Sequence, residues 1–201
     1  MRQAGRHLPE YIKIRQKYKD LMEMFLDPEV ITNISLQPVQ RYGLDACIVF
    51  SDILMIPYAS GCDVSFKEGV GPQVKFNERF NFASHKLDPV IKGIENIKKA
   101  SEVPLIGFVG GPWTTLLYCL FDKEERSQMN KGLIHKNEKI INTHIEDLTD
   151  IISNYAAQQV NAGIDAFQIF ESAAGDLEDE YFDRWCLKPT QKIIHSIKSK
   201  T

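Results

Sequence analysis

The chain alternates short, continuously apolar runs with longer stretches of helical periodicity, and this alternation constrains its fold more than any other feature. Continuous apolar runs are typical of strands buried on both faces, because a strand with one solvated face alternates apolar and polar residues. The runs span residues 45–50, 104–108 and 166–170. The intervening pattern predicts helices over residues 27–40, 88–100, 137–161 and 188–199, and another that starts near Trp113.

Buried strands that alternate with helices predict an α/β fold with a parallel sheet. The pattern leaves two architectures open, a doubly wound sheet and a (β/α) barrel. Residues 59–82 interrupt the alternation, since they contain several glycines and alternate at Val64 and Phe66, which predicts a hairpin-like excursion. Gly163 is placed to end the long helix that precedes the third strand.

Length and composition describe an ordinary globular protein. A chain of 201 residues forms one large or two small domains, and its hydrophobic content of 43% supplies a sizeable core. The net charge of −3 argues against a general nucleic-acid binder. No apolar run reaches the ~18 residues of a membrane span. The scattered cysteines Cys47, Cys62, Cys119 and Cys186 indicate neither a disulfide framework nor a structural zinc site, and favour reduced thiols in a cytosolic-type protein.

Polar residues recur just after the predicted strands. Ser51-Asp52 follows the first run, Tyr118 follows the second, and Glu171-Ser172 follows the third. In a (β/α) barrel the carboxyl ends of all strands meet at one mouth, so these groups would share a site. Taken singly, a Ser-Asp pair after a strand, such as Ser51-Asp52, is most often a helix cap.

The opening residues Met1-Arg2-Gln3-Ala4-Gly5-Arg6 place two arginines four positions apart around a flexible Ala-Gly. Such a pair is either a solvated loop or a clamp that recognises carboxylate or phosphate through its guanidinium groups. Asp52, set between apolar residues, is costly to bury without a partner, and a cationic or N–H-rich ligand would supply one.

Other common chemistries have no motif here. The sequence lacks the glycine-rich nucleotide loops, the Gly-x-Ser-x-Gly elbow and the His-Glu-x-x-His zinc motif. Its remaining histidines lie among polar residues and are expected to be solvated: His85, His135, His144 and His195. The charged run 122–126 predicts a solvated loop or a helix start.

Four segments together resemble the uroporphyrinogen decarboxylase family, in the family's order and at compatible spacing. They are Met1-Arg2-Gln3-Ala4-Gly5-Arg6-His7-Leu8-Pro9-Glu10, Phe50-Ser51-Asp52-Ile53-Leu54, Gly107-Phe108-Val109-Gly110-Gly111-Pro112-Trp113-Thr114 and Phe170-Glu171-Ser172-Ala173-Ala174-Gly175. Two positions depart from the usual family pattern, His7 and Ala173.

The resemblance implies a (β/α)8 TIM barrel and an enzyme of porphyrin and haem biosynthesis. The implied reaction removes carbon dioxide from the four acetate arms of uroporphyrinogen III to give coproporphyrinogen III, with neither metal nor organic cofactor. It also implies a homodimer, without a nucleic-acid or membrane partner. The implied compartment is the cytoplasm, with the plastid as an alternative.

The resemblance also implies roles for individual residues. Substrate would be bound by Arg2, Gln3, Ala4, Arg6, Asp52, Tyr118 and Ser172. Of these, Asp52, Arg2 and Tyr118 would take part in catalysis: Asp52 would accept hydrogen bonds from the pyrrole N–H groups, Arg2 is a candidate for proton transfer, and Tyr118 would position the reacting acetate.

The main difference from the family is the length of the chain. A complete (β/α)8 barrel takes ~250 residues, and we expect residues 1–201 to form an incomplete barrel domain of about the first four βα units, truncated at both ends. The chain as given is therefore expected to show little turnover. Two alternatives stay open: a related zinc-dependent barrel methyltransferase, and a non-catalytic tetrapyrrole-binding fragment.

Overall fold

The computed structural model describes residues 5–67 and 71–198. The N-terminal part contains α1 (Pro9–Arg15), α2 (Leu21–Phe25), α3 (Pro28–Tyr42), β1 (Cys47–Ile48), α4 (Met55–Ala59), β2 (Asp63–Lys67), β3 (Gly71–Lys75), the 3₁₀ turn η1 (Ser84–Leu87) and α5 (Asp88–Ala100). The C-terminal part contains β4 (Leu105–Gly110), α6 (Pro112–Leu120), α7 (Lys123–Ser127), α8 (Lys131–Asn161), β5 (Ala166–Phe170), the 3₁₀ turn η2 (Ala174–Asp176), α9 (Asp179–Phe182), the π-turn η3 (Asp183–Leu187) and α10 (Lys188–Lys198).

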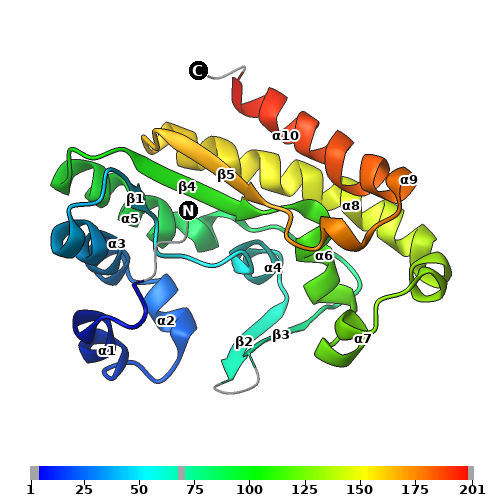
Figure 1. Cartoon of the computed structure of the whole chain (residues 1–201), viewed down its shortest axis with the longest axis horizontal. Coiled ribbons are helices and arrows are strands. Elements are labelled where there is room, and N and C mark those ends of the chain that lie inside the picture. Colours follow the sequence, from blue (N-terminus) through cyan, green and yellow to red (C-terminus); the bar gives the residue numbers. More distant parts are fainter. Residues whose placement is uncertain (1–4, 68–70, 199–201) are drawn as a thin grey trace.

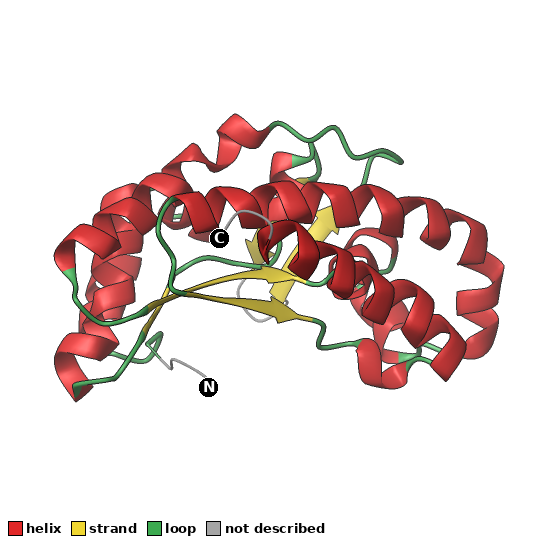
Figure 2. Ribbon diagram, turned by 90° about the horizontal axis from the view of Figure 1, so that it is seen from above, coloured by secondary structure: helices red, strands yellow, loops and turns green. Residues whose placement is uncertain are grey.

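The central sheet has three parallel strands in the order β1-β4-β5. Cys47 pairs with Leu105, and Ile106 to Gly110 pair with Ala166 to Phe170. Helices connect the strands and gather around the sheet, with α10 running alongside α8 (Figures 1 and 2). The predicted α/β class is confirmed: within the described residues the chain forms an open part of a (β/α) barrel.

The first strand is shorter than the predicted run 45–50. Val49 still donates a backbone hydrogen bond to Ile106, but the backbone N–H of Phe50 donates to the Ser35 hydroxyl at 2.8 Å instead of to the sheet. The Ser35 hydroxyl on α3 thus takes the place of a hydrogen-bond acceptor in the sheet. The chain leaves the sheet after β1 and continues into the segment that contains Ser51 and Asp52.

Helix boundaries follow from local capping. The Asp27 side chain accepts hydrogen bonds from the backbone N–H groups of Glu29 and Val30, and α3 ends at Gly43, whose φ of 60° is left-handed. Helix α8 begins six residues before the predicted start (Lys131 rather than 137), because Asn130 caps the N–H of Leu133. Gly163, with φ of 100°, follows that helix as expected.

The excursion predicted over residues 59–82 contains the antiparallel pair β2 and β3, which confirms the hairpin. Figure 1 shows the pair projecting away from the three-stranded sheet. Phe66 on β2 packs edge-on against Phe25 of α2, with ring centroids 5.6 Å apart. The hairpin is therefore anchored to the N-terminal helices through its apolar face.

The Asp165 side chain holds the amino-terminal ends of β4 and β5 together. Asp165, just before β5, accepts hydrogen bonds from the Leu105 backbone N–H at 2.7 Å and from the Lys98 ammonium at 2.6 Å. These donors lower the pKa of the Asp165 carboxyl. The bonds tie α5, β4 and β5 together at the amino-terminal edge of the sheet.

Three aromatic rings join α6 to the C-terminal helices. Trp113 stacks on Trp185 with ring centroids 5.3 Å apart. Tyr181 also stacks on Trp185, with centroids 4.3 Å apart. Both tryptophans are at most 1% exposed, and the Trp185 indole donates to Asn142 of α8. Burial of rings of this size contributes about 2–3 kcal/mol each, so the stack is a principal contact between these elements.

Candidate functional site

The carboxyl ends of the parallel strands bring three segments to one edge of the sheet. Ser51 and Asp52 follow β1, the Gly110-Gly111 turn follows β4, and Glu171 and Ser172 follow β5. The Gly111 backbone N–H donates to the Phe170 carbonyl at 2.8 Å, so the latter two segments are in direct contact. This is the edge where (β/α) barrels carry their sites.

Asp52 is half-buried, and its carboxylate interacts with the backbone that follows it and with the charge of Arg6. One carboxylate oxygen accepts a hydrogen bond from the Leu54 backbone N–H at 3.0 Å. Burial raises the pKa of the Asp52 carboxyl, while the Leu54 bond and the positive charge of Arg6 oppose that rise. A ligand that donates hydrogen bonds or carries positive charge would stabilise the carboxylate here.

Arg6 is exposed and lines a cavity of about 250 Å³ beside the sheet. The cavity wall is formed by α3 and by residues at or beyond the strand ends, among them Ser51, Phe108 and Phe170. Phe108 and Phe170 pack edge to face, with centroids 5.5 Å apart. The structure thus brings Arg6 and Asp52 together beside a partly apolar hollow.

The Ser51 hydroxyl interacts with the phenol of Tyr155, which is buried on α8. Burial raises the pKa of Tyr155, so it remains a neutral phenol. The contact holds Ser51, the third residue after β1, against the long helix, and so supports the position of the neighbouring Asp52.

Tyr118 lies on α6 and lines a different cavity, of about 350 Å³, with β3 and α7. The Arg126 guanidinium lies over its ring, 4.3 Å from the centroid. A third cavity of about 500 Å³ is lined by both Arg6 and Pro72, and Pro72 also lines the Tyr118 cavity. Pro72 is therefore common to the walls of the two cavities that Tyr118 and Arg6 line.

Ser172 is exposed directly after β5. Its turn is held by neighbours on both sides: the Glu171 carboxylate accepts from the Thr114 backbone N–H at 2.5 Å, and the Thr114 hydroxyl accepts from the Ala173 backbone N–H at 3.2 Å. The Trp113 indole donates to the Ala173 carbonyl at 3.3 Å. The turn is thus fastened to the first turn of α6.

Glu171 and Arg126 were not among the residues singled out for a role. Burial raises the pKa of Glu171 to about 7, against the lowering effect of its bonds to Thr114 and Trp113. Its second carboxylate oxygen is buried and has no partner among the described residues. In the sequence, the place of Glu171 directly before Ser172, after a predicted strand, indicates that it lies near the site. Nothing in the sequence indicates the Arg126–Tyr118 contact.

The remaining predicted site residues, Arg2, Gln3 and Ala4, lie outside the described residues. Their roles, and those of Arg6, Asp52, Tyr118 and Ser172 towards a substrate, stay predictions. No group of three or more His, Cys, Asp or Glu side chains within residues 5–67 and 71–198 is arranged to hold a metal ion.

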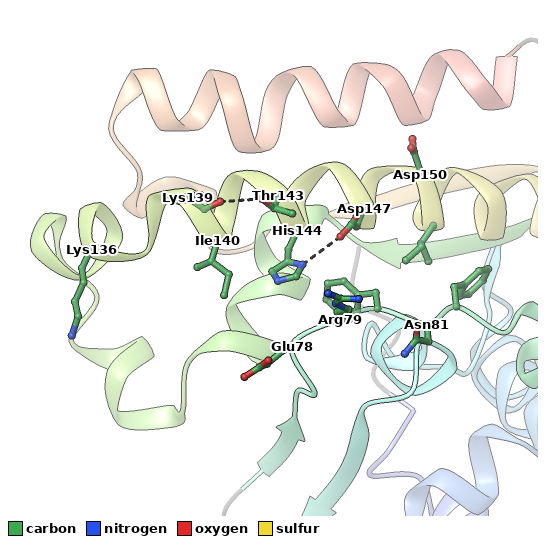
Figure 3. A pocket seen from close by; sticks show the side chains of 13 residues that line it. Glu78, Arg79, Asn81, Lys136, Lys139, Ile140, Thr143, His144, Asp147 and Asp150 are labelled. Carbon is green, nitrogen blue, oxygen red and sulfur yellow. Dashed lines mark hydrogen bonds and ion pairs between the residues drawn. The ribbon is translucent and has the colours of Figure 1, made fainter.

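A further hollow, of about 970 Å³, lies between α8 and residues 78–82 (Figure 3). His144 lines this hollow and, contrary to the prediction, is buried, whereas His85, His135 and His195 are exposed as predicted. His144 is only 6% exposed, because the rings of Phe76 and Phe80 pack edge-on against its imidazole. Its Nδ1 atom lies 3.4 Å from Asp147 (Figure 3).

The described residues include no helix that has both the length and the apolar character to cross a membrane. Among solved structures, a methyltransferase from Methanosarcina mazei has the same fold, with a TM-score of 0.70 over 89% of this chain and 56% of that chain. The two sequences are 21% identical, so this similarity concerns architecture alone.

Curated relatives named uroporphyrinogen decarboxylase extend the comparison to sequence. The protein from Rickettsia rickettsii (strain Sheila Smith) is 38% identical over 98% of this chain, and that from Chelativorans sp. (strain BNC1) is 36% identical over the whole of this chain. The chain spans about 60% of the length of these relatives. The family described as Uroporphyrinogen decarboxylase (URO-D) matches residues 1–201. Since this match covers every residue, including the segments that meet at the carboxyl edge of the sheet, the chain belongs to the uroporphyrinogen decarboxylase family.

Proposed function

We propose that the protein decarboxylates the four acetate arms of uroporphyrinogen III, giving coproporphyrinogen III, and that the described residues form part of the site. The proposal rests on family membership and on one observation in particular. Asp52, a half-buried carboxylate whose pKa burial raises, lies within the influence of the Arg6 charge, beyond the carboxyl end of β1.

Arg6 matches the charge of this substrate. Uroporphyrinogen carries eight carboxylates, and a guanidinium binds a carboxylate through charge-assisted hydrogen bonds that contribute about 1.5–3 kcal/mol each. Arg6 lines two cavities, and Arg15 lines one of them, so these cationic groups are available to the carboxylates of the propionate and acetate arms.

Asp52 supplies the complementary group for the centre of the macrocycle. Pyrrole N–H groups donate hydrogen bonds to its carboxylate and replace the water that burial removes. Binding therefore lowers the raised pKa of Asp52 and keeps the group ionised. A carboxylate fixed at this point also stabilises positive charge that develops on the ring.

The decarboxylation passes through a positively charged pyrrole ring. Protonation of a pyrrole carbon creates a cationic ring that accepts the electron pair when the bond between the acetate methylene and its carboxylate breaks. Carbon dioxide leaves, the methylene carbon then takes up a proton to become a methyl group, and the ring loses its extra proton. Asp52 stabilises the cationic ring through this sequence, and Tyr118 and Ser172 contact the arms that hold the reacting acetate in place.

The complete protein is proposed to be a homodimer, as the family resemblance implies. Light scattering on the purified protein measures its mass directly, and a monomer at all accessible concentrations contradicts this part of the proposal.

The function is tested by anaerobic incubation of the protein with uroporphyrinogen III, followed by oxidation and chromatographic separation of the porphyrins. Loss of carboxylates in steps from eight to four supports the decarboxylase. Tight binding without carbon dioxide release supports a tetrapyrrole-binding role instead. The assay is run on residues 1–201 and on the complete gene product, because the relatives are longer than this chain.

A further inference from the structure

The hollow of about 970 Å³ between α8 and residues 78–82 shares no lining residue with the smaller cavities of about 250, 350 and 500 Å³. Its volume is in the upper part of the range for small-molecule sites, about 300–1,000 Å³. One wall is a face of α8, on which Lys136, Ile140 and His144 follow one another at intervals of four residues. Figure 3 shows these three side chains on the side of the helix that faces residues 78–82.

Aromatic rings hold the facing segment against α8. The Phe76 and Phe80 rings lie 4.6 Å apart, and both pack edge-on against the His144 imidazole, at centroid distances of 5.0 and 5.4 Å. Between them, Glu78 has a φ of 61°. This left-handed conformation is uncommon for a residue with a side chain and persists only where neighbouring contacts hold it. The hollow is therefore preformed, and a ligand orders little of the chain when it binds.

The basic residues of the lining are available to a ligand. Arg79, Lys136 and Lys139 are exposed and line the hollow. None of the three has an ion-pair partner among the residues that the structure describes. A guanidinium or ammonium group in this situation binds a carboxylate, sulfonate or phosphate group through charge-assisted hydrogen bonds.

The acidic residues of the lining are engaged to a greater degree. Asp150 lies 2.6 Å from the ammonium of Lys192, which is not part of the lining, and Asp147 lies 3.4 Å from Nδ1 of His144. Even with Asp147 counted as fully negative, only that residue and Glu78 oppose the three basic side chains. The excess of positive charge favours an anionic occupant and disfavours a cationic one.

The remaining wall is apolar. Phe80, Phe82 and Ile151 are half-buried, and Ile140 is 39% exposed. We propose that this hollow is a binding site for a small organic anion with an apolar body. The anionic group lies at Arg79 and the two lysines, and the apolar body packs against Phe80, Phe82 and Ile140.

The test uses two probes that differ only in one sulfonate group. 8-Anilinonaphthalene-1-sulfonate has an aromatic body and a negative charge, and N-phenyl-1-naphthylamine has the same body without the charge. Fluorescence titration of the protein should show saturable binding of the sulfonate probe. Absence of saturable binding overturns the proposal.

Charge variants test the recognition of the anion. Arg79→Gln should raise the Kd of the sulfonate probe about threefold to tenfold and leave that of the neutral probe unchanged, because one charge-assisted contact is lost. Lys99→Gln is the matched control, since it removes an exposed positive charge from α5 that is not part of the lining. Equal effects of the two variants on the sulfonate probe overturn the proposal.

A blocking variant tests the location. Thr143 is exposed on α8 and lines the hollow, so the larger ring in Thr143→Trp should fill part of it and weaken the binding of the sulfonate probe by tenfold or more. Circular dichroism checks that the variant is folded. Unchanged binding in folded Thr143→Trp places the probe elsewhere and overturns the proposal. The result is independent of the proposed decarboxylation, because binding is measured without turnover.

Discussion

The side-chain amide of Gln159 on α8 forms two hydrogen bonds with the backbone of Phe108 on β4. Its oxygen accepts from the Phe108 N–H at 3.1 Å, and its nitrogen donates to the Phe108 carbonyl at 3.0 Å. Gln159 is 2% exposed, so the pair lies in the core between helix and sheet. Because Phe108 lines the hollow beside Arg6, this amide also fixes one wall of the candidate site.

Gln159→Ala should therefore destabilise the protein strongly. The substitution removes both side-chain partners of the partly buried Phe108 N–H and carbonyl, and each loss costs about 1–3 kcal/mol. Chemical denaturation should show a loss of about 2–4 kcal/mol in the free energy of unfolding. Gln158→Ala is the matched control, since Gln158 bonds to Asn154 on the outer side of the same helix. Equal losses in the two variants would show that the Phe108 bonds are unimportant.

Gly107→Ala tests the close approach of β4 to α8. A Cβ atom at residue 107 would lie 2.5 Å from the Gln159 side-chain oxygen and 2.8 Å from Ile164. Strain of this kind in a packed core costs about 1–3 kcal/mol. Gly175→Ala is the control, because nothing lies within 4 Å of a Cβ there. Thermal unfolding should distinguish them, and an unchanged midpoint for Gly107→Ala would contradict the packing.

Glu171 should make stability depend on pH. Its folded-state pKa of about 7 lies above its ordinary value of 4.5. The folded protein therefore binds more protons than the unfolded chain between these values, so stability is fully present below pH 4.5 and falls as pH rises through about 7. The contribution is on the order of 3 kcal/mol.

Glu171→Gln removes this titration. The difference in unfolding free energy between wild type and variant should change over the same pH interval, measured by urea denaturation at each pH. Glu102→Gln, which removes the charge of an exposed carboxylate before β4, is the control for the loss of one negative charge. A flat difference for Glu171→Gln would rule out the raised pKa.

Asp52→Asn should weaken binding of the macrocycle. The amide presents one acceptor and two donors where the carboxylate presents acceptors alone, so it loses charge-assisted bonds to pyrrole N–H groups. We expect a loss of about 1.5 kcal/mol or more, which is about tenfold in Kd. Anaerobic equilibrium dialysis with uroporphyrinogen III measures the affinity, and an unchanged Kd removes Asp52 from the site. Circular dichroism of the variant controls for folding.

Strong local sequence patterns are sufficient to predict strands of the sheet and helices that pack on it. The predicted ranges 88–100 and 166–170 coincide with α5 and β5, because apolar periodicity, Pro89 and the continuous strand pattern all agree there. By contrast, α1 and α2 were not predicted. With seven and five residues they contain too few turns to show a periodicity.

The remaining differences arise from contacts between residues distant in the chain. The Ser35 hydroxyl shortens β1, and the rings of Phe76 and Phe80 bury His144 among polar neighbours of its own helix. The candidate site shows the same limit. Motifs identified Asp52 and Arg6, but the fastening of Ser172 by Glu171 depends on α6, which the sequence does not place beside it.

The Lys98–Asp165–Leu105 contact has a practical consequence for anyone who wishes to alter this protein. It lies at the amino-terminal edge of the strands, at the far end of β5 from Glu171 and Ser172. Reinforcing or loosening that network should tune heat resistance while leaving ligand recognition intact. The contacts that join the strands at this edge can therefore be altered without touching the residues that line the candidate site.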